Sequence, residues 1–106
     1  MPDQDLENSV FSIQLEGQSY RLYMPNAGED YIQTKVATER KPYELEMLRD
    51  MGSYLDSGDL VLDIGANIGN HTFYLSEIVG CKVIAFEPNT VLVEAMRKSV
   101  ELNDCS

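Results

Sequence analysis

Residues 59–88 constrain the fold of this chain more than any other part of its 106 residues. They begin with an apolar, β-branched run, Leu60–Ile64, which predicts a parallel strand with layers packed on both of its faces. The run ends in a loop of sequence GANIG, Gly65–Gly69, whose two glycines permit a tight turn and close approach of a ligand to the backbone. A helical stretch and a second apolar run, Val83–Phe86, follow. This order predicts a right-handed βαβ unit, the core of a nucleotide-type binding site.

Other elements are predicted around and within this unit. Alternating apolar and polar residues at 10–15 and 20–24 predict a β-hairpin, and residues 31–38 fit either a third strand or the start of a helix. A helix is predicted from Lys41, with Pro42 in its first turn and a core-facing stripe of Met47, Leu48, Met51, Tyr54 and Leu55. Two later helices are predicted by further stripes: Ile68, Thr72, Leu75 and Val79, ended by Gly80, and then Leu92, Ala95, Met96 and Val100.

Two acids near the glycine loop narrow the class of ligand. A dinucleotide site needs GxGxxG, but Asn67 stands at the second glycine, and Asp63 precedes the loop, where a carboxylate would repel phosphate. Glu87 follows the second apolar run, where a carboxylate can accept hydrogen bonds from both hydroxyls of a ribose. The two acids therefore fit a ligand with an unphosphorylated ribose at one end and a cationic amino acid at the other, as in S-adenosylmethionine.

Two more side chains are candidates for the same ligand. Glu44 lies near the start of the helix that precedes the first parallel strand, where its carboxylate could hold a sulfonium or, as the alternative, be a solvated helix-face acid. His71 is predicted in the first turn after the glycine loop. It could face the ligand or act as a base, or it could be a partly exposed bystander. Asp63 has an alternative role as an acceptor for backbone N–H groups of the loop.

The segments VLDIGANIGNHTFYL and VIAFEPN, with a helix closing on VELND and with Tyr43-Glu44 upstream, resemble a known family. They are similar to the first half of class I S-adenosylmethionine-dependent methyltransferases, and within that class to the FkbM family. The resemblance implies that the methionine part of the cofactor is lined by Gly65, Ala66, Asn67 and Gly69, and that Asp63 supports its amino group. It also implies that Glu87 holds the ribose, with Pro88 and Asn89 beside the adenine.

The resemblance also implies a fold and an activity. We expect an α/β fold, a Rossmann-like class I methyltransferase sheet present only as its first part: a βαβ unit preceded by a helix and an N-terminal hairpin. Residues 1–40 would form a tail and hairpin extension, and residues 41–106 an incomplete S-adenosylmethionine-binding domain. The expected reaction is O-methylation of a small-molecule hydroxyl. The family's later strands have no counterpart here, so we expect the chain to be inactive alone, and no residue stands out as a catalytic base.

Charge and cysteine content limit the partners. Eight basic and 18 acidic residues give a net charge of −10, which disfavours nucleic acid and anionic membranes because their phosphates would be repelled. The two cysteines, Cys81 and Cys105, lack metal-ligand spacing, so we predict no metal site and a reduced, cytoplasmic location. The open edge left by the absent strands predicts self-association.

Two other classes of protein fit part of the pattern. One is an NAD-type nucleotide-binding oxidoreductase module, which Asp63 and Asn67 disfavour. The other is a non-catalytic Rossmann-like interaction module that binds no cofactor. Titration with NAD and with S-adenosylhomocysteine separates these two classes from the methyltransferase.

Overall fold

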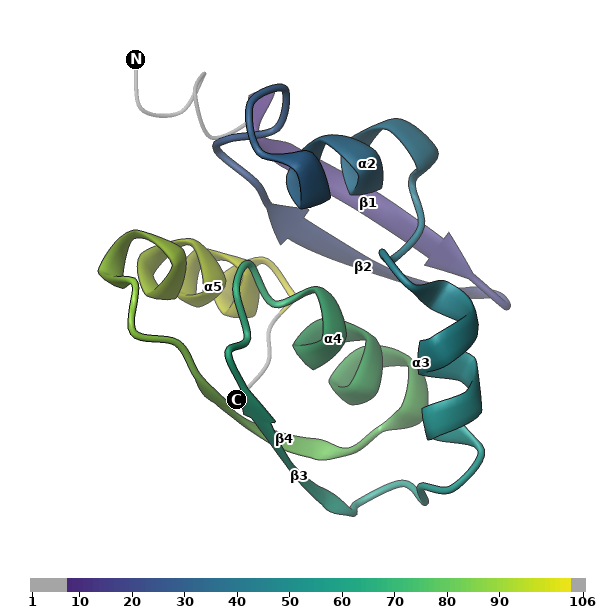
Figure 1. The fold of residues 1–106 in the computed structure, drawn as a ribbon. Helices are drawn as coiled ribbons and strands as arrows, with labels where there is room; N and C mark the ends of the chain where they lie inside the picture. Colours follow the sequence, from purple (N-terminus) through teal and green to yellow (C-terminus); the bar gives the residue numbers. More distant parts are fainter. Residues whose placement is uncertain (1–7, 104–106) are drawn as a thin grey trace.

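The computed structural model describes residues 8–103 (Figure 1). The elements follow in the order β1 (Val10–Leu15), β2 (Gln18–Tyr23), α2 (Tyr31–Glu39), α3 (Leu45–Gly52), β3 (Leu60–Ile64), α4 (Asn70–Phe73), the π-helical segment η1 (Tyr74–Val79), β4 (Lys82–Phe86) and α5 (Thr90–Leu102). The first residues of the predicted tail, 1–7, and Cys105 lie outside the described residues. Within residues 8–103, no helix is long and apolar enough to cross a membrane.

The predicted hairpin is present. β1 and β2 pair antiparallel from Val10 opposite Tyr23 to Leu15 opposite Gln18. The turn between them places Glu16 at φ 54° and Gly17 at φ 81°, and two consecutive positive φ angles match the twist of a two-residue hairpin. The choice left open for residues 31–38 is decided in favour of a helix, α2, because the Asp30 carboxylate accepts a hydrogen bond from the Gln33 N–H (2.9 Å) and so caps it.

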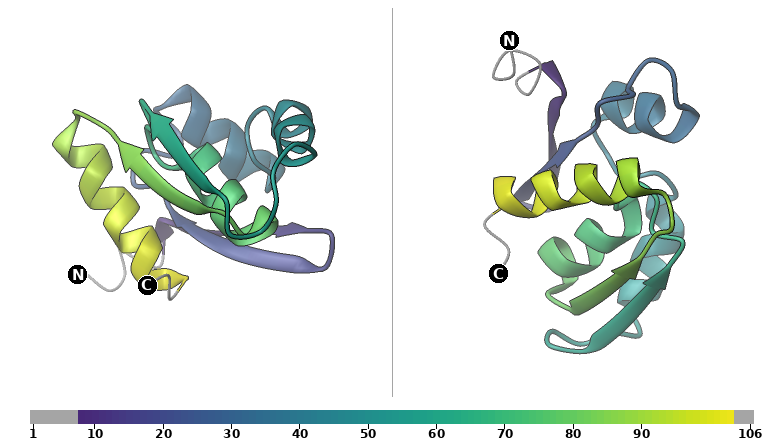
Figure 2. Two further views of the ribbon diagram at one scale, coloured as in Figure 1. Left: turned by 90° about the horizontal axis from the view of Figure 1, so that it is seen from below. Right: turned by 90° about the vertical axis from the view of Figure 1, so that its left-hand side faces the viewer.

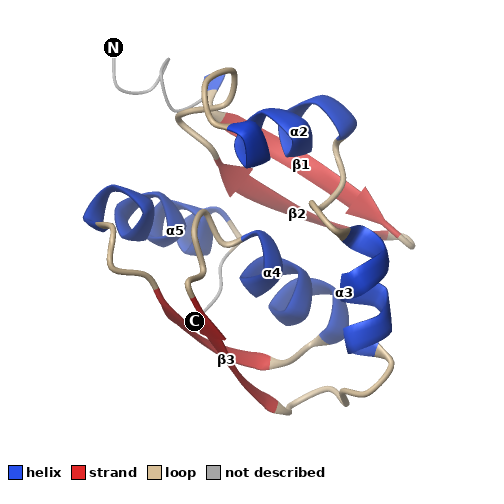
Figure 3. Cartoon of the chain, in the orientation of Figure 1, coloured by secondary structure: helices blue, strands red, loops and turns tan. Residues whose placement is uncertain are grey.

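β3 and β4 form the predicted parallel pair, in register from Leu60 opposite Lys82 to Ile64 opposite Phe86. The hairpin and this parallel pair lie on opposite sides of a middle layer that contains α4, η1 and α5 (Figure 2). Both parallel strands end at the same side of the molecule, and the glycine loop leaves β3 there (Figure 3). The chain therefore brings the loop after β3 beside the segment after β4.

The parallel sheet has helices on one face only among the described residues. Its other face carries large apolar side chains that are 47–73% exposed: Leu60, Leu62, Ile64, Ile84 and Phe86. The prediction that the strand Leu60–Ile64 is packed on both faces is therefore wrong. The reason is that only Val61 and Asp63 of this strand face the helices, whereas Leu60, Leu62 and Ile64 lie on a face that no described element covers.

The hairpin packs against the helices of the βαβ unit. One core cluster joins Ile13, Leu22 and Met24 of the hairpin region to Phe73 of α4 and Met96 of α5. Polar contacts add to this packing along β2. The Ser99 hydroxyl accepts from the Tyr23 N–H (2.8 Å), and the Asn103 carboxamide accepts from Arg21 N and donates to Arg21 O (2.7 and 2.6 Å). The hairpin is thus fastened to α5 by both apolar and hydrogen-bonded contacts.

Helix α3 begins later than predicted. It starts at Leu45 instead of near Lys41, and Pro42 lies in the irregular segment before it, because Glu44 adopts a left-handed conformation (φ 60°) that interrupts helical geometry. Leu48 is fully buried, as predicted, but Met47 and Tyr54 are 40% and 83% exposed. Tyr54 lies beyond the end of the helix at Gly52, so the predicted periodicity does not apply to it.

The other helices also differ in detail from their predicted stripes. Ile68, in the loop before α4, and Leu75 are buried as predicted, whereas Thr72 and Val79 are only partly buried. The structure also buries Phe73 and Tyr74, where α4 gives way to the wider η1. Gly80 ends this segment at φ 88°, as predicted. In α5, Ala95 and Met96 are buried as predicted, whereas Ser99 occupies the buried position expected for Val100.

Gly69 tests the packing of the glycine loop. A Cβ at this position would lie 2.6 and 2.7 Å from ring carbons of Phe73, and the residue has φ +95°. Gly58 has a similar φ of +91° with open space around a Cβ, so it isolates the backbone cost. We expect Gly69→Ala to lower the free energy of unfolding by about 1–3 kcal/mol more than Gly58→Ala, because of overpacking. Urea unfolding measures both, and equal losses would contradict the clash.

Tyr20 tests a buried polar group. Its side chain is 2% exposed, and its hydroxyl has no hydrogen-bond partner among the described residues. Burial, with smaller contributions from Tyr74 and Glu77, raises the pKa of this phenol above its ordinary value. We expect Tyr20→Phe to leave the free energy of unfolding unchanged or raise it by up to about 1 kcal/mol at neutral pH.

The dependence of stability on pH in the alkaline range gives a second test of Tyr20. Because its pKa is raised on folding, the unfolded state loses the proton first, so this group lowers stability as the pH rises above about 10, the ordinary tyrosine pKa. Tyr20→Phe should reduce that loss, whereas Tyr54→Phe, at an exposed position, should retain it. Thermal unfolding between neutral and alkaline pH tests this, and a marked loss of stability in Tyr20→Phe at neutral pH would contradict it.

Candidate functional site

A cavity of about 150 Å³ lies at the glycine loop. It is lined by Ile32, Tyr43, Glu44, Gly65, Ala66, Asn67, Asn70 and His71. The structure therefore brings together five of the residues that the sequence predicts for the cofactor: Glu44, Gly65, Ala66, Asn67 and His71. The other five lie outside this lining: Asp63, Gly69, Glu87, Pro88 and Asn89.

The glycine loop is held open by its backbone geometry. Gly65 and Asn67 have positive φ angles of 76° and 57°, and the N–H groups of Gly65 and Ala66 both donate to Phe86 O (2.8 and 3.0 Å). This pair of bonds ties the loop to the end of β4. A Cβ at Gly65 would meet nothing within 4 Å, so the backbone there faces open space that a ligand can approach.

Glu87 connects the two loops that follow the parallel strands. Its Oε1 accepts from the Asn67 N–H (2.8 Å) and its Oε2 accepts from the Asn89 N–H (3.0 Å). These two backbone donors compensate for the partial burial of the Glu87 carboxylate. The sequence did not indicate that Glu87 would hold the loop backbone in this way. A carboxylate offers about four lone-pair sites, so each oxygen retains capacity to accept from a ribose hydroxyl.

Asp63 lies on the face of β3 that meets the helices. Its Oδ2 accepts from the Thr72 hydroxyl of α4 (2.6 Å). The sequence suggested backbone N–H donors for this carboxylate, and the structure supplies a side-chain hydroxyl instead. The two acids thus bind neighbouring segments: Glu87 binds Asn67 in the glycine loop, and Asp63 binds Thr72 in the helix that follows it.

Glu44 and His71 form a pair inside the cavity lining. His71 Nε2 lies 3.3 Å from Glu44 Oε1, and the two side chains are 32% and 44% exposed. The alternative that His71 is a bystander rested on its having no identifiable partner, and the structure supplies one from a segment 27 residues upstream. The pair places a carboxylate and an imidazole beside the exposed loop backbone, where either can meet a polar ligand.

Sequence reasoning missed Asn70 and Ile32, and it assigned no role to Tyr43. Asn70 is 5% exposed, and its carboxamide accepts from Tyr43 N and donates to Tyr43 O, both at 2.8 Å. The Tyr43 ring packs edge-on against Tyr31, with ring centroids 6.1 Å apart. Asn70 belongs to the GNHT segment that carries the family resemblance, and that was the only sequence signal for it.

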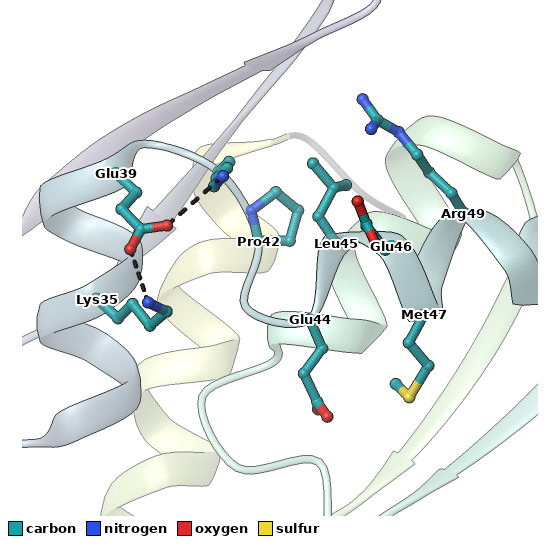
Figure 4. A pocket seen from close by; sticks show the side chains of 9 residues that line it. Lys35, Glu39, Pro42, Glu44, Leu45, Glu46, Met47 and Arg49 are labelled. Carbon is teal, nitrogen blue, oxygen red and sulfur yellow. Dashed lines mark hydrogen bonds and ion pairs between the residues drawn. The ribbon is translucent and has the colours of Figure 1, made fainter.

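A larger cavity of about 510 Å³ lies between α2 and α3 (Figure 4). The Glu39 carboxylate on its α2 wall pairs with Lys35 (2.8 Å) and Lys41 (3.7 Å), and the α3 side carries Leu45, Glu46 and Met47. Glu44 lines this cavity as well as the smaller one. The two cavities therefore share one lining residue, Glu44.

No metal centre is found in the described part of the chain. Residues 8–103 contain no group of three or more His, Cys, Asp or Glu side chains that could hold a metal ion. The residues at the glycine-loop cavity offer a carboxylate, one imidazole, a side-chain amide and backbone amides.

Comparison with known proteins supports the fold. No protein-family model matches the sequence, and no curated protein matches it. Among solved structures, the chain is similar to the crystal structure of Pyrococcus abyssi tRNA (uracil-54, C5)-methyltransferase in complex with S-adenosyl-L-homocysteine, with a TM-score of 0.58 and 21% identity. The match covers 92% of this chain and 22% of that one, so the chain spans about a fifth of that protein's length. The predicted fold, a Rossmann-like α/β arrangement in which a βαβ unit is preceded by a helix and an N-terminal hairpin, is confirmed, and the chain shares it with part of that methyltransferase.

Proposed function

We propose that this chain is the cofactor-binding first part of an S-adenosylmethionine-dependent methyltransferase. The observation that carries the proposal is the glycine-loop cavity, whose lining includes both the open backbone at Gly65 and the acid Glu44. A negative group here suits an ammonium or sulfonium and repels a pyrophosphate. The solved neighbour, which shares the fold, was crystallised with S-adenosyl-L-homocysteine, the demethylated form of this cofactor.

The size of the cavity suggests which part of the cofactor it takes. At about 150 Å³ it is smaller than the roughly 300–1,000 Å³ typical of pockets for drug-sized ligands, so it would hold only the amino-acid end. The ribose would then extend toward Glu87, whose carboxylate is fixed beside Asn67, and the adenine toward Pro88 and Asn89. Asp63 would support the ammonium group from the strand side.

In the proposed reaction, the main contribution of the protein is to align the methyl donor with the acceptor. S-adenosylmethionine supplies a methyl group that passes to an acceptor hydroxyl as the carbon–sulfur bond breaks, and the hydroxyl proton is lost to solvent. The residues of this chain would bind the donor and hold it in one orientation. Holding the reactants in line can contribute about 7–11 kcal/mol to lowering the barrier.

The acceptor and the family are proposals of the same kind. We propose a small-molecule hydroxyl as acceptor, as in the FkbM family, because a net charge of −10 opposes RNA binding, although the solved neighbour is a tRNA methyltransferase. The 510 Å³ cavity shares Glu44 with the donor cavity and is our proposed side for the acceptor. A cytoplasmic location remains a prediction from the cysteine content.

Ligand titration tests the proposed function. We expect calorimetry to detect binding of S-adenosylhomocysteine and none of NAD. Glu87→Ala should weaken the binding by about 1–3 kcal/mol, because ribose hydroxyls lose their acceptor. Glu101→Ala, on the exposed face of α5, should not change it. Because Glu87 also holds Asn67 and Asn89, the melting temperature of each variant without ligand separates lost folding from lost binding.

The outcomes of this titration separate the three classes of function. Unchanged affinity in Glu87→Ala would remove Glu87 from the ligand site. Preference for NAD would favour the oxidoreductase module. If neither ligand binds or shifts the melting temperature, the cofactor proposal fails and the interaction module, which the exposed apolar face of the sheet also suits, is favoured.

We also propose that the uncovered face and open edges of the β3–β4 sheet pair with a second copy of this chain. The face carries five large apolar side chains and Lys82 but no acid, so pairing of two copies there would bring no carboxylates of the face into contact. Light scattering should give a mass above 11.9 kDa, and Ile84→Lys should lower it. Val91→Lys, at an exposed apolar position on α5, is the control; a monomeric wild-type chain would contradict the proposal.

A further inference from the structure

Asn70 makes a two-point contact with a distant stretch of backbone. Its buried carboxamide binds both the N–H and the C=O of Tyr43, 27 residues upstream, at 2.8 Å each. Breaking either bond would leave a largely buried polar group of Asn70 without its partner, which is costly. The contact therefore fixes the position of the Tyr43 peptide groups relative to the first turn of α4.

The residue held next to this contact is Glu44. It has a φ of 60°, a conformation that non-glycine residues adopt rarely and that persists only where the surroundings impose it. Its side chain makes no capping bond to α3, although its carbonyl accepts from Leu48 N (3.0 Å). The carboxylate is instead directed to His71, the neighbour of Asn70 in α4. Asn70 and His71 thus hold the backbone and the side chain of the same short segment.

We propose that Asn70 is a positioning residue, which sets Glu44 at the glycine loop as the receptor for the ammonium group of the cofactor. This inference rests on the proposed function and adds that Glu44, held in place by Asn70, recognises the cationic end of the ligand. Asn70 acts through Tyr43 and Glu44 and need not touch the ligand. Without its carboxamide, Glu44 would relax from the left-handed conformation and its carboxylate would leave the cavity.

The chain contains a matched control for a merely structural role. Asn103 binds the N–H and C=O of Arg21 in the same two-point manner, at 2.7 and 2.6 Å. That contact lies between α5 and β2, and neither residue lines the glycine-loop cavity. Asn103→Ala removes the same kind of bond pair as Asn70→Ala, so a comparison of the two variants separates general stability from an effect on the site.

A pair of ligands reports on the cationic end alone. S-adenosylhomocysteine carries the amino acid, whereas 5′-methylthioadenosine keeps the nucleoside and sulfur without it. We expect Asn70→Ala to weaken the affinity for S-adenosylhomocysteine at least about tenfold, the scale of one charge-assisted hydrogen bond. The affinity for 5′-methylthioadenosine should remain nearly unchanged. Glu44→Gln should do the same, and the double variant should lose little more. Asn103→Ala should leave the ratio of the two affinities unchanged.

A ligand-free measurement keeps the inference testable if no nucleoside binds. His71 is the single histidine, so its ring protons give unambiguous NMR signals. Glu44→Gln should shift these signals in the wild-type background and in Asn103→Ala, but not in Asn70→Ala, where Glu44 has already moved away. An equal shift in the Asn70→Ala background would overturn the inference, as would equal weakening of both ligands. Absence of all ligand binding with the expected NMR result would overturn the proposed function and the receptor role of Glu44, and would leave standing only the positioning of Glu44 by Asn70.

Discussion

The parallel pairing of β3 with β4 is the constraint on which the rest of the structure depends. Parallel neighbours need a crossover, and here α4 and η1 supply it and give the hairpin and α5 a surface to pack against. The pairing also puts the ends of both strands together, so that Phe86 O can accept from Gly65 N and Ala66 N. The shape of the glycine loop is thus a consequence of strand register. Gly69, packed against Phe73, marks where the loop enters the helix.

The acids of the candidate site serve the fold as well as the proposed ligand. Glu87 binds two backbone N–H groups, Asp63 binds the Thr72 hydroxyl, and Glu44 pairs with His71. Each carboxylate therefore has a fixed direction before any ligand arrives, which reduces the ordering that binding would require. The same arrangement means that a substitution at these positions changes the loop as well as the charge, so binding and stability must be measured together.

The uncovered face of the parallel sheet sets this chain apart from a finished α/β domain. Parallel sheets are ordinarily covered on both faces, yet Leu62, Ile64 and Phe86 are about half or more exposed. The hairpin does not compensate, because it packs on the helical layer and lies on the far side of it (Figure 2). This exposed apolar surface is the one that we propose a second copy of the chain covers.

The hairpin, the βαβ order, the glycine turn and the end of η1 at Gly80 could be predicted from the amino-acid sequence, because alternation, helical periodicity and turn chemistry are local properties. The sequence also singled out Glu44 and His71, but not that they meet. The contact of Glu44 with His71 and that of Asn70 with Tyr43 follow from the folded path of the chain, because each joins residues 27 positions apart. The late start of α3 depends on the same contacts, since it follows from the left-handed conformation of Glu44. The structure also shows which face of β3 is uncovered. The sequence could not predict this, because an apolar run indicates that a strand can be buried but does not indicate which element covers it.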